Sequence, residues 1–344
     1  MNEEIQAYQD VLFAGIPKFL APYLETKAMR RLRGIGLFCG TDYTKLYRHR
    51  YFYSRMDHSV AVALIVWHFT GDKKQALAGL FHDISTPVFS HSVDFMNGDA
   101  WTQMSTEAKT AEMIRGAPEI CSLLKRDGIA AEDVLDYHRY PIADNDSPRL
   151  SADRLEYTFS TALVWQGLWS VAEIGAMVHD LVIRPNESDE PELCFQSVPM
   201  AERFVHGSAA VCKAYQTNEN KTALSMLGDL LKLGVDTELF TADELYEMTE
   251  DQAVSRFLNA RDGRIRRAWY AFAGMERVFG SETKPKGCYG VRVNAKRRYI
   301  NPLCLSGGQA LRVEAISDTA KAELDELLSY EAAPYGCVDF ELWR

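Results

Sequence analysis

Arg55-Met-Asp-His58 and Ala78-Gly-Leu-Phe-His82-Asp83-Ile-Ser-Thr86-Pro-Val-Phe-Ser-His91 are the two segments that decide the fold. The first opens an apolar run that is typical of a buried helix over residues 55–69, ending near Gly71. The second closes another helix, over residues 73–83, because the residue before Pro87 disfavours helical geometry. We therefore expect two packed helices at the centre of a mainly α protein.

These segments place imidazoles and a carboxylate among apolar residues. His58 and His82 are 24 residues apart (82 − 58 = 24), which fits ligands from two neighbouring helices better than two from one helix. Asp83 follows His82 directly, so both can face one point only near a distorted helix end, which the following Ile-Ser-Thr-Pro supplies. A second carboxylate, Asp153, falls in the first turn of a helix that Ser151 can cap. Such a set suits one divalent ion (Mn, Fe, Co, Ni, Zn or Mg) with positions left open for water that attacks phosphorus.

The remainder of the chain reads as further helices and a few strands. Four segments have the apolar character of strands: residues 181–184, 192–195, 288–293 and 310–316. The first two flank a polar loop and predict a β-hairpin. We predict a helical domain over residues 1–264, with its core at about 30–180, and a small α+β region over residues 265–344 packed on it.

The composition excludes several classes of partner. The 344 residues are 47% hydrophobic and 25% charged, which is enough apolar material for a large core. A formal net charge of −10 argues against broad binding to nucleic acid or to an anionic membrane. Seven cysteines without C-x-x-C spacing, and no signal-peptide pattern, predict a cytoplasmic protein. We interpret the basic clusters as solvent-exposed faces: residues 30–33, 264–267 and 296–298.

Three motifs resemble the signature of the HD-domain phosphohydrolases: Arg55-x-x-His58-Ser-Val, Ala78-Gly-Leu-Phe-His82-Asp83 and Pro87-x-Phe-Ser-His91. The branch that they resemble is that of the deoxynucleoside-triphosphate triphosphohydrolases (dGTPase-like enzymes), whose Asp-x-x-x-Tyr segment is similar to Asp153-Arg-Leu-Glu-Tyr157. The likeness extends over about residues 15–305. It implies an HD-domain helical bundle, a phosphate substrate of the nucleotide class and a homo-oligomer.

The resemblance also implies a role for each motif residue. The implied metal ligands are His58, His82, Asp83 and Asp153. Arg55 would hold a phosphate with its planar fork of donors, and Tyr157 would line a nucleoside pocket. His91 would approach the substrate, and we add Arg154 to the substrate-binding set. The residues that we expect to be catalytic are Asp83, His91 and Glu107.

Two positions depart from the branch. The triphosphohydrolases usually have histidine where this chain has Thr86, and a His-Glu pair where it has Thr106-Glu107. A threonine cannot shuttle protons at pH 7 as imidazole can. Glu107, His91 or His138 could substitute, although His138 also reads as a polar surface residue.

Several other aromatic and histidine residues have a plainer interpretation. His179-Asp180 precedes a strand-like run and lacks a small-residue helix before it, so we interpret it as a decoy. The tryptophans of the apolar runs are predicted to be core residues: Trp67, Trp165 and Trp169. The tyrosines just before His58 either line a cleft or simply pack: Tyr43, Tyr47, Tyr51 and Tyr53.

The sequence thus predicts a divalent-metal phosphohydrolase acting on a (deoxy)nucleotide, releasing either triphosphate or orthophosphate. The alternative is a catalytically degenerate HD protein that binds a metal or nucleotide as a sensor or assembly module, which Thr86 and Thr106 favour. A helical scaffold without metal is the third interpretation.

Overall fold

The structure is a computed structural model that describes residues 2–107, 109–294 and 297–341. In these ranges the helices before the hairpin are α1 (Glu3–Leu12), α2 (Ala21–Leu24), α3 (Lys27–Arg31), α4 (Arg55–Thr70), α5 (Lys73–Phe81), α6 (Ser92–Met96), α7 (Thr110–Arg115), α8 (Pro118–Arg126), α9 (Ala152–Thr161) and α10 (Val171–His179). The later helices are α11 (Val198–Gln216), α12 (Asn218–Asp236), α13 (Glu250–Leu258), α14 (Gly263–Ala273) and α15 (Asp318–Ser329). The strands are β1 (Leu181–Pro185), β2 (Pro191–Phe195), β3 (Phe279–Ser281), β4 (Tyr289–Val291), β5 (Leu303–Ser306), β6 (Gln309–Arg312) and β7 (Tyr335–Val338). The protein is therefore mainly α, as predicted.

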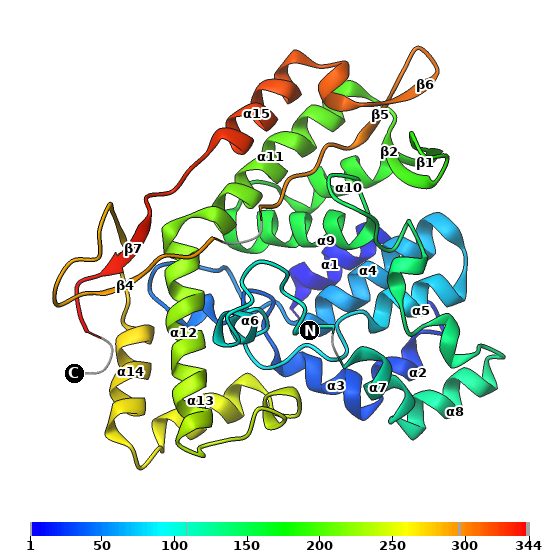
Figure 1. The fold of residues 1–344 in the computed structure, drawn as a ribbon. Coiled ribbons are helices and arrows are strands. Elements are labelled where there is room, and N and C mark those ends of the chain that lie inside the picture. The colour runs from blue at the N-terminus through cyan, green and yellow to red at the C-terminus, as the bar shows by residue number, and fades with distance from the viewer. Residues whose placement is uncertain (1, 108, 295–296, 342–344) are drawn as a thin grey trace.

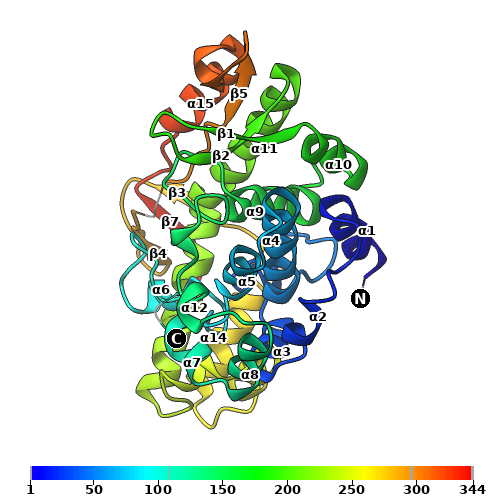
Figure 2. The ribbon, with the colours of Figure 1, turned by 90° about the vertical axis from the view of Figure 1, so that its right-hand side faces the viewer.

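Helix α4 occupies the centre of the molecule, between α1, α5 and α9 (Figures 1 and 2). Its middle turns, residues 62–66, are fully buried, which explains why its sequence is apolar all round rather than on one stripe. Ser54 begins the helix with a capping box to Asp57, and Gly71 ends it in the left-handed conformation. Both ends agree with the helix predicted from the sequence.

Helix α5 packs closely on α4 because it presents small residues to it. A Cβ atom added at Gly79 would lie 3.3 Å from Val62 Cγ1 and 3.4 Å from a methyl group of Val66. The helix ends at Phe81, and the next residues form a tight turn in which Ile84 N–H donates to Phe81 O and Thr86 N–H to Asp83 O. The predicted distortion after His82 is confirmed.

The described strands form two sheets, with orders β1-β2-β5-β6 and β3-β7-β4. The predicted hairpin is confirmed: β1 and β2 pair antiparallel, with Leu181 opposite Phe195. Strand β2 then pairs parallel with β5, with Cys194 opposite Leu303. The hairpin is thus completed by strands from the C-terminal part of the chain.

The C-terminal part of the chain, from α14 onward, extends from one end of the molecule to the other (Figures 1 and 2). It passes from α14 at one end, through β3 and β4, to β5, β6 and α15 at the other end, and it returns to place β7 between β3 and β4. We expected one α+β unit here. Instead, its strands belong to two sheets, because residues 303–306 complete the hairpin sheet rather than a sheet of their own. The division into two domains at residue 265 stays a prediction.

In the described ranges, no helix combines the length and the apolar character that crossing a membrane requires.

Candidate metal centre

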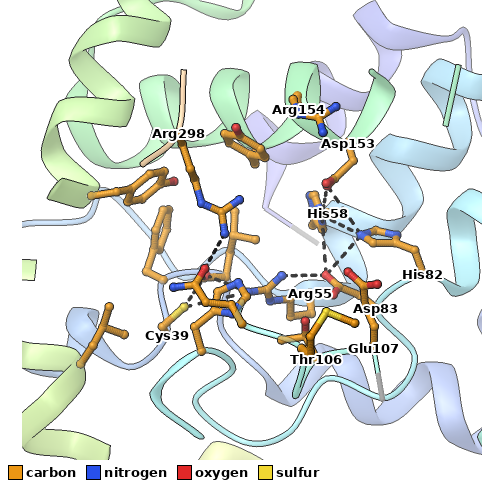
Figure 3. A pocket seen from close by; sticks show the side chains of 18 of the residues that line it. Cys39, Arg55, His58, His82, Asp83, Thr106, Glu107, Asp153, Arg154 and Arg298 are labelled. Carbon is orange, nitrogen blue, oxygen red and sulfur yellow. Dashed lines mark hydrogen bonds and ion pairs between the residues drawn. The ribbon is translucent and has the colours of Figure 1, made fainter. Parts of the chain in front are cut away.

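The four predicted metal ligands meet at one point (Figure 3). His58 Nε2 lies 3.1 Å from His82 Nε2, and Asp83 Oδ2 lies 3.6 Å from the first and 3.4 Å from the second. Asp153 Oδ1 lies 3.1 Å from His58 Nε2 and 3.7 Å from His82 Nε2. The two carboxylates approach the imidazoles from opposite sides (Figure 3). Helices α4 and α9 and the turn after α5 therefore bring together residues that are up to 95 positions apart (153 − 58 = 95).

The environment of each imidazole leaves its Nε2 atom free for a cation. His58 Nδ1 faces the carboxylate of Glu156, and His82 Nδ1 lies 2.7 Å from the carbonyl oxygen of Gly79. Both acceptors favour N–H at Nδ1, so the Nε2 atom of each ring carries a lone pair when the imidazole is neutral. The residue pattern of a histidine ligand backed by a carboxylate or carbonyl is typical of metal sites.

The donor set fits a divalent ion. The two imidazole Nε2 atoms lie 3.1 Å apart, and each carboxylate lies 3.1–3.7 Å from both of them, an arrangement that repels unless a proton or a metal ion supplies positive charge between them. Ligands about 2.0–2.2 Å from an ion are separated from their neighbours by about 3.0–3.5 Å, which is close to the spacings observed. In the described part of the chain, the ligand atoms of His58, His82 and Asp83 all lie within 4.8 Å of one another, and Asp153 lies close to both imidazoles without being part of that group.

Asp83 is fixed by two further side chains. Arg55 Nη1 donates to Oδ2 at 2.7 Å, and Thr86 Oγ1 donates to Oδ1 at 2.7 Å. Burial alone would raise the pKa of Asp83, but Arg55 and the two imidazoles hold this pKa well below its usual range. Thr86 therefore orients the carboxylate of a predicted metal ligand.

The cluster forms one wall of a cavity of about 260 Å³, which is near the lower limit for small-molecule sites. The remaining walls come from the segment before α4, from α6 and the loop after it, from the segment before α9, from α9 and the turn after it, from α11 and α12, and from the connector that precedes β5. All nine residues that were assigned a site role from the sequence line this cavity: Arg55, His58, His82, Asp83, His91, Glu107, Asp153, Arg154 and Tyr157. His91 is held by Asp94, with Nδ1 and Oδ2 2.9 Å apart.

Glu107 lies near the predicted metal ligands and is paired with the imidazole of His138. Its carboxylate accepts from Tyr137 OH at 3.2 Å and faces His138 Nε2 at 3.1 Å. The other ring nitrogen of His138 lies 2.9 Å from Asp144 Oδ2. These two hydrogen bonds raise the pKa of His138 to about 10. His138 is half exposed, as a surface residue would be, but it also lines the cavity.

Two arginines have surroundings other than those expected: Arg154, which was expected to bind substrate, and Arg298, which was expected to be solvent-exposed. The guanidinium of Arg154 donates to Asn145 Oδ1 at 2.7 Å and lies 3.1 Å from Asp144, so its donors are engaged by the protein. The interpretation of residues 296–298 as a solvent-exposed face is wrong for Arg298, which lines the cavity, and right for Arg297, which is exposed. Lys296 lies outside the described residues.

The structure also decides the alternatives for the aromatic residues. The tyrosines before α4 pack rather than line the cavity: Tyr53 OH donates to Glu156, Tyr47 packs on Trp165, and Tyr43 packs between Phe89 and Trp269. Trp165 was expected in the core but lines the cavity, because the chain forms a π-helical turn at residues 162–166 after α9. The decoy interpretation of Asp180 is confirmed, since this carboxylate accepts hydrogen bonds from Gln196 and Ser197.

Sequence reasoning missed three residues that support the site. Glu156 lies three positions after Asp153, a spacing that puts both on one face of α9 and that could have identified it. Asp144 lies in an irregular segment, and Arg298 in a connector between strands; neither has a spacing signal.

No protein-family model matches the chain. It is 26% identical over 243 residues to an uncharacterized protein of Bacillus subtilis, YdhJ, covering 70% of this chain and 71% of the relative. It is also 26% identical over 144 residues to the metal-dependent phosphohydrolase cns2 of Cordyceps militaris, covering 42% of this chain and 40% of that protein. The chain thus matches less than half the length of this second relative.

Two solved structures share the fold over nearly the whole chain. One is a hypothetical protein from Aquifex aeolicus, with a TM-score of 0.67, 16% identity, and coverage of 97% of this chain and 96% of that one. The other is a phosphohydrolase from Bacteroides thetaiotaomicron, with a TM-score of 0.65, 13% identity, and coverage of 96% and 98%.

Proposed function

We propose that the protein is a divalent-metal-dependent phosphohydrolase that acts on a small organic phosphate of the nucleotide class. The observation that carries the proposal is the meeting of four ligand atoms, from His58, His82, Asp83 and Asp153, in the wall of a cavity. The likeness to a metal-dependent phosphohydrolase supports the reaction class. A divalent ion held by these residues supplies positive charge to phosphoryl oxygens and acidifies water.

The protein's own groups divide the remaining work. Arg55 fixes Asp83 and adds positive charge beside the phosphate position. Glu107 faces the cavity as the group that would accept a proton from the attacking water. His138 contacts Glu107 on one side and Asp144 on the other, and it orients the Glu107 carboxylate. An imidazole from residue 138 thus lies beside Glu107, whereas the family's triphosphohydrolases use a histidine next to the glutamate in sequence.

The far side of the cavity supports a substrate with a planar group. Tyr157, Tyr215 and Trp165 line it, and their rings contact one another with centroids 6.1–6.4 Å apart. Aromatic faces of this kind stack on nucleobases and on other flat rings. We assign the substrate to the nucleotides on this ground, within the dGTPase-like branch that the sequence resembles.

The test is a product analysis. Protein loaded with Mn²⁺ or Co²⁺ is incubated with nucleoside mono- and triphosphates, and orthophosphate and triphosphate are measured separately. The proposal expects one of these products at a rate that a chelator abolishes. A protein that keeps its metal and releases neither product with any common divalent ion would instead be the sensor or assembly module.

A further inference from the structure

Three arginines of the described part of the chain line the cavity, and two of them are paired with carboxylates. Arg55 is paired with Asp83 at 2.7 Å, and Arg154 is paired with Asp144 at 3.1 Å. Arg298 differs: among the described residues it has no carboxylate partner. Its one hydrogen bond in these ranges runs from Nη2 to the side-chain carbonyl of Gln103, at 2.7 Å. Since a guanidinium has five N–H donors, most of its capacity remains available.

Among the described residues no carboxylate pairs directly with Arg298; burial lowers its pKa, but the nearby Tyr157 and Tyr215 and the more distant Asp153 carboxylate raise it overall. Its guanidinium carbon lies 5.9 Å from the centre of the Tyr157 ring, and Tyr215 and Asn220 line the same side of the cavity. Burial, together with the nearby Arg298 and Arg55, lowers the pKa of His91 against the opposing effect of Asp94. A partly buried cation without a directly paired carboxylate is costly unless a ligand supplies the opposite charge.

Arg298 lies across the cavity from the metal ligands. In Figure 3 its side chain reaches into the cavity from the side opposite His82. Tyr157, which it covers, follows Asp153 by four residues on α9, so the two lie on one face of the helix. Four residues correspond to about 6 Å along a helix axis. A ligand whose phosphate is at the metal ligands would therefore need a second anionic group a few bonds away to reach Arg298.

Gln103 holds the guanidinium in this position. It belongs to the loop after α6, which also brings Thr106 and Glu107 to the cavity, whereas Arg298 comes from the connector before β5. The hydrogen bond between them joins segments that are 195 residues apart. An arginine fixed by a neutral amide keeps its charge for a ligand and loses little side-chain entropy when the ligand binds.

We propose that Arg298 forms a subsite for a second anionic group of the substrate, separate from the phosphate at the metal ligands. The substrate class is then a phosphate ester or anhydride with two anionic groups, such as a nucleoside di- or triphosphate or a bisphosphate, rather than a simple monoester. This assignment rests on the proposed function, because it takes the first phosphate to lie at the metal centre.

The experiment compares two ligands that cannot be hydrolysed at their P–C bonds. Methylenediphosphonate and methylphosphonate are titrated calorimetrically into the full-length protein at one fixed free Mn²⁺ concentration. The variants are Arg298→Met and, as the matched control, Arg297→Met, which removes the exposed neighbouring arginine. Arg298→Lys is the second variant, which keeps the charge and loses the planar fork. Circular dichroism establishes that each variant is folded.

The wild-type protein and Arg297→Met should bind methylenediphosphonate more tightly than methylphosphonate. Arg298→Met should weaken methylenediphosphonate binding by about 10- to 100-fold and leave methylphosphonate binding unchanged, and Arg298→Lys should fall between. Equal losses for both ligands, or no loss for either, would overturn the subsite. Because neither ligand turns over, the result stands apart from the product analysis: absence of hydrolysis would remove the proposed function, and only the loss pattern decides the role of Arg298.

Discussion

The two ends of the cavity differ in how their charged groups are paired. The metal end holds His58, His82, Asp83 and Asp153, and the other end holds Arg298. At the metal end, each ionisable group described above is paired with a group of opposite charge or a hydrogen-bond partner. Asp83 is paired with Arg55, His58 with Glu156, and Asp153 with both imidazoles. At the other end, Arg298 donates a hydrogen bond to the side-chain amide of Gln103 and lies over the ring of Tyr157.

This difference indicates that the metal end is preformed, whereas the arginine end is completed when a ligand binds. The metal end is a dense network on helices α4 and α9 and the turn after α5, buried in the core. Its residues are held in place by partners behind them, as catalytic and metal sites require. At the arginine end no described carboxylate pairs directly with Arg298, which favours an anion from outside. The following changes test the difference, from the largest expected effect to the smallest.

Removing a ligand should disable the metal end. We expect Asp153→Asn to lower the rate of phosphate release by about 1000-fold or more, which exceeds the 10- to 100-fold that is typical for partners behind the ligands. The measurement is the steady-state rate with Mn²⁺ present, with Asp236→Asn as the control, because Asp236 pairs with Lys232 on the surface. A rate within tenfold of the wild type would show that the cluster is not the reacting end.

Removing a partner behind a ligand should have a smaller effect. Glu156 is fully buried and accepts from Tyr8 OH at 3.1 Å and Tyr53 OH at 2.7 Å, in addition to facing His58. We expect Glu156→Gln to weaken metal binding by about 10- to 100-fold, because the amide no longer fixes the His58 ring as the carboxylate does.

Metal affinity for this variant is measured by competition with a chelator, and Glu276→Gln, in an exposed pair with Lys45, is the control. Unchanged affinity would mean that the orientation of His58 does not depend on Glu156.

The smallest effect concerns His138, which lies beside Glu107 near the metal ligands. Its pKa is about 10 in the folded protein, raised by its hydrogen bonds to Asp144 and Glu107, against about 6.5 in the unfolded chain. Because the folded protein binds this proton more tightly, its stabilising contribution is complete below pH 6.5 and is lost as the pH rises through 10.

His138 is half exposed, so we expect no more than about 1 kcal/mol. Urea unfolding across this pH range should show the wild-type protein losing more stability than His138→Gln, and parallel curves would contradict the prediction.

The same contrast explains what the sequence could predict. The apolar run of α4, the small residues of α5 and the proline after it are local signals, and they place His58, His82 and Asp83 on elements whose packing follows from their composition. The hairpin was equally readable from its polar loop. Asp153 was found through its helix cap and the family resemblance.

Arg298 could not be placed in this way. Its position depends on how the connector crosses the molecule after β4, and that path is set by the pairing of β5 with the distant strand β2. A basic cluster in a loop has no period, so charge alone favours the surface. Asp144 and Trp165 were missed for a related reason, since an irregular segment and a π-helical turn direct them into the cavity.

The most direct test of the account is the metal content of the protein. Elemental analysis is made on wild-type protein, His82→Ala and Asp83→Ala after equilibration with Mn²⁺, Co²⁺ or Zn²⁺ and removal of free ions. The account predicts about one divalent ion per chain in the wild type and a loss of it in both variants. A wild-type protein that retains none of these ions, or variants that retain as much as the wild type, would contradict it.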